Sequence, residues 1–181
     1  FLKDLENEDA WEFVRSSLVN IPSHELVVEL SKCLQNYPLV LQQAVAFIKY
    51  KQSVEDESYG IAEYLQELNS AFDHKIPSTV YDHTILKVFD LTLSKILGVH
   101  PGHNQLSILY ILSLVMPDGI QKEFLKELFS FFELKESFDS SISILKSFSL
   151  IGVNKGEISI HRIVQKLTRD RIKLENKFHL V

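Results

Sequence analysis

The sequence has few of the residues that build disulfide-linked, metal-bound or membrane-spanning domains. One cysteine, Cys33, among 181 residues excludes an internal disulfide framework and a zinc site made of cysteines alone. The longest apolar run, Leu106 to Met116, is interrupted by two serines and is too short to cross a bilayer. Glycine and proline are scarce, at six and five residues, which predicts long helices. A net charge of -5 argues against nucleic acid or an anionic membrane as a partner.

We also expect no signal peptide. A single cysteine suits a reducing compartment, so we expect a cytoplasmic protein. The sequence begins at Phe1 rather than at a methionine. We therefore expect it to be a piece of a longer protein.

Motifs of catalysis and metal binding are missing too. The sequence has neither a G-x-x-x-x-G-K-[ST] phosphate loop nor an H-E-x-x-H zinc helix, so we predict no enzyme activity, no catalytic residue and no metal site. His100 and His103 could offer two imidazoles to a metal, but no third ligand is near them, and a solvated loop is the prediction. Cys33 lies on an apolar helix face and is predicted to be an inert core thiol.

Helical spacing dominates the first part of the chain. Apolar residues recur at helical intervals in four segments, Asp9–Leu18, Leu26–Leu34, Leu39–Ile48 and Ile61–Leu68. Ser23 is the expected N-cap of the second helix, and Pro38 opens the third, where its missing N–H costs nothing. The third helix is apolar almost all round and should lie in the middle of a bundle. We predict a helical bundle over residues 1–76, followed by a linker at His74–Tyr81.

The second part changes from helical to alternating spacing near Leu150. Helices are expected first, at Ile85–Ile96, Leu106–Val115, after Ile120 and at Ser137–Lys146. Two alternating runs then flank Asn154–Glu157, which predicts a β-hairpin with glycine in a short loop. Helical spacing resumes after Ile160. The chain should therefore be mainly α, with a winged helix and one short hairpin over residues 81–175 and a tail at 176–181.

Four stretches occur in the order DLENEDAWEFVRSSL, NYPLVLQQAVAFIKY, LSLVMPDGIQKEFL and LIGVNKGEISIHRIVQKLTRD. In the same order, they resemble four parts of one protein family. These parts are the start of its helical domain, its G-L-P-L helix, the middle of its winged helix, and its terminal wing with a histidine. That family is the NB-ARC type of signal-transduction (STAND) ATPases, particularly those joined to tetratricopeptide repeats. The resemblance implies a part in a nucleotide switch of cytoplasmic signalling, such as innate immunity.

In that family, a P-loop domain binds ADP or ATP, and the helical and winged-helix domains close over it. The resemblance implies that Pro38 lies by the adenine and that His161 reaches the β-phosphate of ADP. Asn36-Tyr37 stand in place of Gly-Leu, and Arg162 stands in place of the aspartate of the M-H-D motif. This chain has no P-loop, so ADP or ATP would be a cofactor only of a longer protein. The partners implied are the P-loop and repeat domains of that protein.

The residues alone leave other interpretations open. Pro38 can be a plain helix-opening proline, and His161 can be a capping or buried imidazole. The chain can be a protein-interaction domain without nucleotide contact, or a DNA-binding winged helix. The last is disfavoured because the helix expected to read DNA carries Asp139 and a single Lys146. The final helix is basic and is predicted to be a solvated face, with Lys166, Arg169, Arg171, Lys173 and Lys177.

Overall fold

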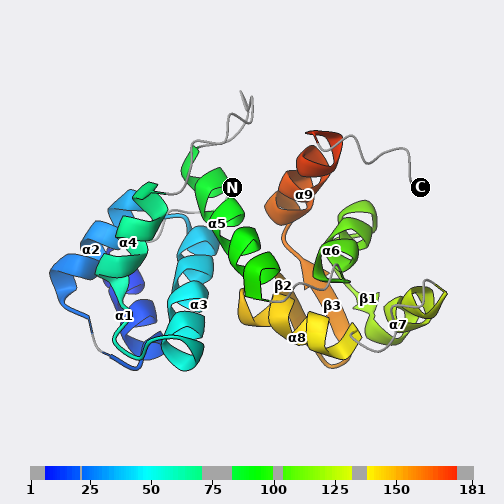
Figure 1. Cartoon of the computed structure of the whole chain (residues 1–181), viewed down its shortest axis with the longest axis horizontal. Coiled ribbons are helices and arrows are strands. Elements are labelled where there is room, and N and C mark those ends of the chain that lie inside the picture. Colours follow the sequence, from blue (N-terminus) through cyan, green and yellow to red (C-terminus); the bar gives the residue numbers. More distant parts are fainter. Residues whose placement is uncertain (1–6, 21, 71–82, 100–103, 132–137, 175–181) are drawn as a thin grey trace. The chain divides into compact units, whose positions relative to one another are not determined.

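The computed structural model describes residues 7–20, 22–70, 83–99, 104–131 and 138–174. Most of them are helical, and a small antiparallel sheet lies in the second part, so the predicted mainly α class is confirmed (Figure 1). The chain divides into two compact units, Phe1–Ser94 and Lys95–Val181. The division falls within helix α5 (His83–Val99), whereas the predicted linker at His74–Tyr81 lies outside the described residues.

The first unit is built around helix α3. Its other helices before α5 are α1 (Asn7–Ser17), α2 (His24–Cys33) and α4 (Ile61–Ser70), and α3 spans Pro38–Val54. Buried residues occupy almost every side of α3, as predicted from its apolar sequence: Val40, Leu41, Gln43, Ala44, Val45, Ala46, Phe47, Ile48 and Gln52. The Phe47 ring meets the Tyr64 ring of α4 edge-on, with centroids 5.5 Å apart. These contacts make α3 the core helix of this unit.

Helix α2 begins as predicted, but only part of its predicted apolar face is fully buried. Ser23 is its N-cap, and the Ser23 side chain accepts a hydrogen bond from the backbone N–H of Leu26. Val27, Leu30 and Leu34 are fully buried, whereas Leu26 and Cys33 are only partly buried. The prediction of Cys33 as a core thiol was therefore wrong. Several registers of apolar residues fit one helical turn, and only packing against α1 and α4 selects among them.

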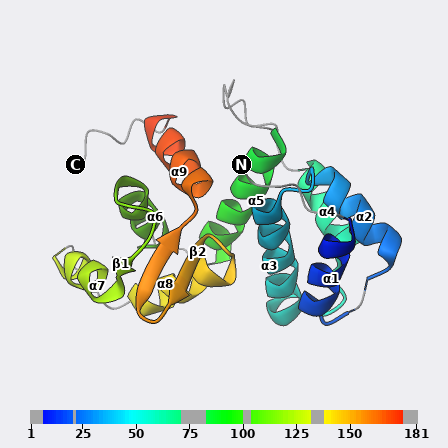
Figure 2. The ribbon, with the colours of Figure 1, turned by 180° about the vertical axis from the view of Figure 1, so that it is seen from behind.

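The second unit has the order of elements of a winged helix. Helix α6 (Asn104–Leu114) is followed by strand β1 (Ile120–Gln121), helices α7 (Lys122–Ser130) and α8 (Phe138–Ser147), strands β2 (Ile151–Asn154) and β3 (Glu157–Ile160), and helix α9 (Arg162–Leu174). The three strands pair antiparallel in the order β1-β3-β2 (Figure 2). The predicted hairpin is confirmed as β2–β3. Strand β1 was not predicted, because two residues are too few to show alternation.

The hairpin closes through a two-residue turn, Lys155-Gly156. Both residues have positive φ, 48° and 82°, which is the backbone of the tight turns that match the twist of paired strands. Asn154 and Glu157 pair on either side of the turn. The carbonyl of Gly156 also accepts a hydrogen bond from the N–H of Lys122, so the tip of the wing is tied to the start of α7.

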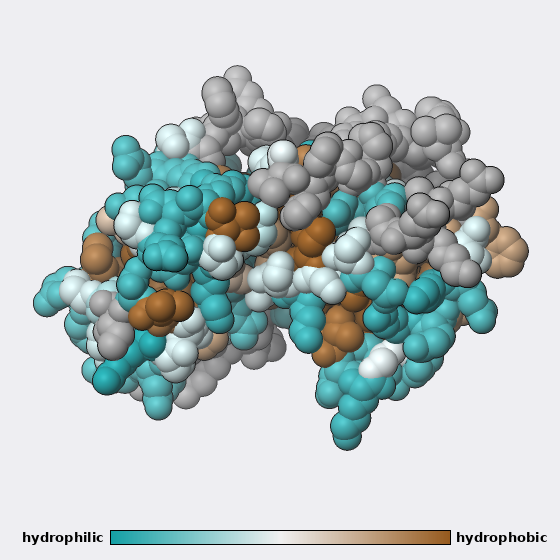
Figure 3. Space-filling model, turned by 60° about the horizontal axis from the view of Figure 1, so that its bottom comes forward, coloured by the Kyte–Doolittle hydropathy of each residue, from teal (hydrophilic) through white to brown (hydrophobic). Residues whose placement is uncertain are grey.

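The core of the second unit lies between the sheet and its helices, and the surface retains some apolar residues. In α7 the buried pair is Leu125 and Phe129, while Phe124 is 56% exposed. In α6, Ile108, Leu109 and Leu112 are buried, but the last residue, Leu114, is 62% exposed. The molecular face in Figure 3 is mostly hydrophilic, with separate small hydrophobic patches. Among the described residues, no helix has the length and apolar character needed to cross a bilayer.

Candidate functional site

His161 lies where strand β3 passes into helix α9. Ile158 and Ile160 of β3 are buried, and Ser159 between them is only partly buried, as alternation along a strand requires. The N–H of Ile160 donates a hydrogen bond to the carbonyl of Pro117 at 2.8 Å. This bond fixes the end of the strand against the segment before β1. The next residue, His161, is therefore held at the corner that the sequence pattern predicts.

The His161 ring caps helix α9. Its Nδ1 accepts a hydrogen bond from the N–H of Ile163 at 3.2 Å, and its carbonyl accepts one from the N–H of Gln165 at 3.0 Å. A ring nitrogen that accepts a hydrogen bond carries no proton, so the neutral ring bears its proton on Nε2. The side chain is partly buried. His161 can thus satisfy one free N–H of the helix start and still offer an N–H donor to a ligand.

Burial sets the protonation state of His161. It lowers the pKa of the imidazole below its ordinary value, and the carboxylate of Asp118 partly opposes this shift. Protonation would also put a proton on Nδ1 and break the bond from Ile163. The folded state therefore favours the neutral ring.

We expect His161 to make the stability of the second unit depend on pH. Because its pKa is lower in the folded than in the unfolded state, its contribution is present above the unfolded value of about 6.5 and is lost as the pH falls through the folded value. Unfolding in urea between about pH 7.5 and 5 measures this. His161→Asn keeps a capping side chain without a titrating group, and should flatten part of the pH dependence. An unchanged dependence would contradict the prediction.

Pro38 lies in the first unit, at the first turn of α3. Tyr37 is the N-cap residue, in an extended conformation and without a side-chain cap, and Pro38 is partly buried. Gln35 and Asn36, just before, both have a φ of 56°. Glycine adopts this left-handed backbone most easily, and asparagine tolerates it better than most residues. Asn36 therefore fits the position where the G-L-P-L motif has glycine.

The structure places Pro38 and His161 in different units, and each is described in its own unit. The described geometry of Pro38 is that of a helix-opening proline, and the described geometry of His161 is that of a helix cap with a second ring nitrogen left for another partner. Their nucleotide contacts remain predictions.

Two side chains of α9 bind the end of α6. Nε2 of Gln165 donates to the carbonyls of Leu112 and Val115 at 2.8 and 2.9 Å, and the guanidinium of Arg169 donates to the carbonyl of Ser113. Gln165 is 5% exposed. The last carbonyls of a helix lack partners within it, and a cation also suits the negative end of its dipole. Sequence reasoning missed this role, since only the i, i+4 spacing of the two residues is visible in the sequence.

Helices α7 and α8 are joined by charge. Asp139 at the start of α8 receives Lys122 at 2.7 Å and Lys126 at 2.6 Å, both from α7. Hydrogen bonds from Lys122 and then Lys126 lower the pKa of Asp139 to about 2. The two lysines that could approach a phosphate backbone from this side are therefore paired with a carboxylate of the helix that would read DNA. This arrangement argues against nucleic acid on this face.

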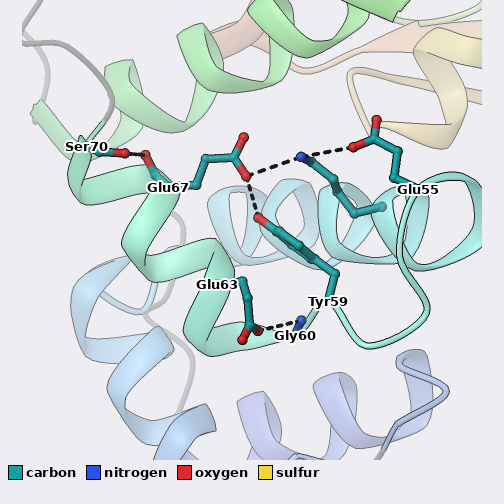
Figure 4. A network of polar contacts seen from close by, with 7 residues as sticks. Glu55, Tyr59, Gly60, Glu63, Glu67 and Ser70 are labelled. Atoms are coloured by element: carbon teal, nitrogen blue, oxygen red, sulfur yellow. Dashed lines mark hydrogen bonds and ion pairs between the residues drawn. The ribbon is translucent and has the colours of Figure 1, made fainter.

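Figure 4 shows a polar network of the first unit that includes Glu55, Tyr59 and Glu67, and Lys51 joins it. Its ammonium contacts the carboxylates of Glu55 at 3.1 Å and Glu67 at 3.5 Å, and it lies over the rings of Phe47 and Tyr59. The Tyr59 hydroxyl donates to Glu67 at 2.7 Å, and burial followed by this bond raises the pKa of Tyr59. The network ties the connection between α3 and α4 to both helices. These contacts stabilise the fold of the first unit.

Other residues singled out in the sequence add no site. His100, His103 and Lys177 lie outside the described residues. Within the described residues, no group of three or more His, Cys, Asp or Glu side chains is arranged to hold a metal ion. Cys33 is partly buried; burial, with Glu29 adding to it, raises the pKa of its thiol and so disfavours the reactive thiolate.

Comparison with known proteins gives one match. Residues 101–177 match a family described as "Domain of unknown function (DUF7779)". The match covers less than half of the chain and includes all of α6 to α9, so it coincides with the winged-helix unit. No curated protein and no solved structure matches the chain.

Proposed function

We propose that this chain is the regulatory, non-catalytic part of an NB-ARC-type nucleotide switch. It closes over ADP or ATP held by a P-loop domain elsewhere in a longer cytoplasmic protein, beside a repeat domain. Pro38 lies by the adenine, and His161 donates to a phosphate. The observation that carries this proposal is the state of His161: a neutral ring whose Nδ1 is occupied by the helix start and whose Nε2 is the proton donor.

Two features beside His161 suit an anion, and they act against the nearby carboxylate of Asp118. The start of α9 carries a positive partial charge from its N–H groups, and an anion there is stabilised. Arg162, which stands where the M-H-D motif has aspartate, is exposed and adds a full positive charge beside the imidazole. The imidazole does not need its own charge to donate, because Nε2 keeps its proton in the neutral ring.

Asn36 supports the other half of the proposal. Its backbone is left-handed, a conformation that glycine adopts most easily, and glycine is the residue at this position of the G-L-P-L motif. The connection brings Pro38 to the first turn of α3, the core helix of its unit. A proline held there offers a rigid apolar surface to a flat base.

Switching follows from differential contact. A nucleotide that touches His161 in the closed state and loses this contact in the open state stabilises the closed state by the free energy of that contact. A hydrogen bond to a charged phosphate contributes about 1.5–3 kcal/mol. This chain supplies the contact and the two-state movement, while the P-loop domain supplies phosphate and magnesium binding.

The test changes His161 in the full-length protein and separates capping from phosphate contact. Aspartate at position 161 keeps an N-cap side chain, but its carboxylate repels a phosphate. We expect His161→Asp to fold normally and to bind ADP about 10- to 100-fold more weakly, by calorimetric titration. His161→Asn is the uncharged control, which also caps and can donate from its amide, and it should retain more of the ADP affinity.

Thermal unfolding and ADP affinity are interpreted together. Thermal unfolding of the variants shows whether the helix start is intact, because loss of an N-cap costs about 1 kcal/mol. A folded His161→Asp protein that binds ADP as tightly as the unchanged protein would contradict the phosphate contact. His161 would then be only a helix cap, and the chain would be a protein-interaction domain without nucleotide contact.

A further inference from the structure

The exposed face of helix α9 carries a basic stripe. We define this stripe as Arg162, Lys166, Arg169 and Lys173, which follow one another at i, i+4, i+7 and i+11 and so share one side of the helix. Arg162 and Lys173 are exposed, and Lys166 and Arg169 are partly buried. Val164, Leu167 and Ile172, on other sides of α9, are buried, and Arg171 opposite the stripe is partly buried. The helix holds five basic residues and one acidic residue in a chain of net charge -5, so positive charge is concentrated here.

An apolar strip lies directly beside the basic stripe. We define it as Leu114, Val115 and Met116, which are 62%, 36% and 77% exposed. Arg169 binds the carbonyl of the residue just before the strip, and Gln165, one turn earlier on α9, binds the carbonyl of Val115 within it. These bonds connect the strip and the stripe within one unit. The backbone of the apolar strip therefore lies against the helix that carries the basic stripe.

Hydrogen bonds to the backbone of the apolar strip and of its neighbours hold the strip in place. Gln165 and Arg169 together make three hydrogen bonds to the backbone from Leu112 to Val115. The carbonyl of Pro117, just after Met116, accepts the N–H of Ile160. Single exposed apolar residues are ordinary on a protein surface, but three consecutive ones anchored at both ends form a preformed feature. A preformed surface loses little conformational freedom on binding a partner.

We propose that the basic stripe and the apolar strip form a docking surface for an acidic amphipathic helix of a protein partner. Leucine-type side chains of the partner cover Leu114 and Met116, and its carboxylates face Arg162 and Lys173. Charge complementarity selects this occupant. Nucleic acid fits less well, because an apolar strip offers nothing to phosphates. The surface shares Arg162 with the surroundings of His161, whereas Lys173 and the apolar strip belong to the docking surface alone.

The test uses the whole chain and two synthetic peptides. Each peptide is a fluorescent amphipathic helix of about 20 residues, long enough to fold in part alone. The acidic peptide carries leucine on one face and glutamate on the other. The basic peptide is identical except that lysine replaces every glutamate. Fluorescence anisotropy at about 0.15 M salt should show the acidic peptide binding at least about tenfold more tightly than the basic one. Equal binding of the two peptides would overturn the proposal.

Amino-acid replacements test which residues of the chain bind the acidic peptide. Arg162→Glu combined with Lys173→Glu should weaken the acidic peptide at least about tenfold, and Met116→Ser should weaken it about fivefold. Lys32→Glu combined with Lys155→Glu makes the same change in net charge at exposed positions elsewhere, and should have less than about a twofold effect. Circular dichroism checks that each variant is folded. Equal weakening by both double variants, or displacement of the peptide by duplex DNA in the wild type at equal concentration, would contradict the proposed surface.

Discussion

Replacing Gln165 by leucine is expected to lower the free energy of unfolding of the second unit by about 2–4 kcal/mol. The side chain is almost fully buried, and its amide donates to the carbonyls of Leu112 and Val115. Leucine fills a similar volume but donates nothing, so a buried carbonyl at the end of α6 loses its partner. An unsatisfied buried acceptor costs about 1–3 kcal/mol, and two bonds are lost here.

The control is Gln121→Leu, which makes the same chemical change at the surface. Gln121 donates to Glu157 in an exposed pair, so its replacement should change the free energy of unfolding by less than about 0.5 kcal/mol. Urea unfolding gives the two free energies, and hydrogen exchange of the amides in α6 and α9 assigns the loss to this unit. Equal effects of the two replacements would mean that Gln165 does not hold the end of α6.

The periodic parts of this fold could be predicted from the sequence. Helices α1, α3, α4, α8 and α9 bury apolar residues at helical spacing, and the hairpin β2–β3 has alternating residues around Lys155-Gly156. Pro38 and Ser23 mark helix starts, because each fits a position with its own local chemistry. The spacing of apolar residues is enough to predict a helix or strand wherever one face of that element is buried.

The remaining features depend on residues far apart in the sequence. Strand β1 exists because Ile120 pairs with Ile158, and a two-residue strand has no pattern of its own. Gln165 meets Leu112 across 53 positions, and nothing near either residue indicates the other. The buried face of α7 is set by Leu125 and Phe129 rather than by Phe124, since tertiary packing decides between adjacent apolar residues.

For the candidate site too, some features could be predicted from the sequence and others could not. The position of His161 at the junction of strand and helix follows from alternation before it and helical spacing after it. Its bond to the N–H of Ile163 and the effect of Asp118 on its pKa depend on how the chain turns there. The capping role and the proposed phosphate contact use different ring nitrogens, so one does not exclude the other.

Phe129→Ala should be the most destabilising single replacement considered, at about 3–5 kcal/mol. The Phe129 side chain of α7 is fully buried, and its ring centroid lies 5.5 Å from that of Phe138 in α8, at an interplanar angle of 45°. Alanine would leave a cavity and remove an aromatic pair worth about 0.5–1.5 kcal/mol beyond its buried area. The ion pairs between α7 and α8 are exposed and contribute little, so this buried contact should matter more for their packing.

Phe124→Ala is the matched control, because it deletes the same side chain from the same helix at a position that is 56% exposed. It should change the free energy of unfolding by less than about 0.5 kcal/mol. Thermal unfolding followed by circular dichroism compares the two, and in a domain of this size each kcal/mol lowers the melting temperature by about 4–8 °C. A melting temperature that falls equally in both variants would place Phe129 outside the core. A large fall confined to Phe129→Ala would confirm that the Phe129–Phe138 contact holds α7 on α8.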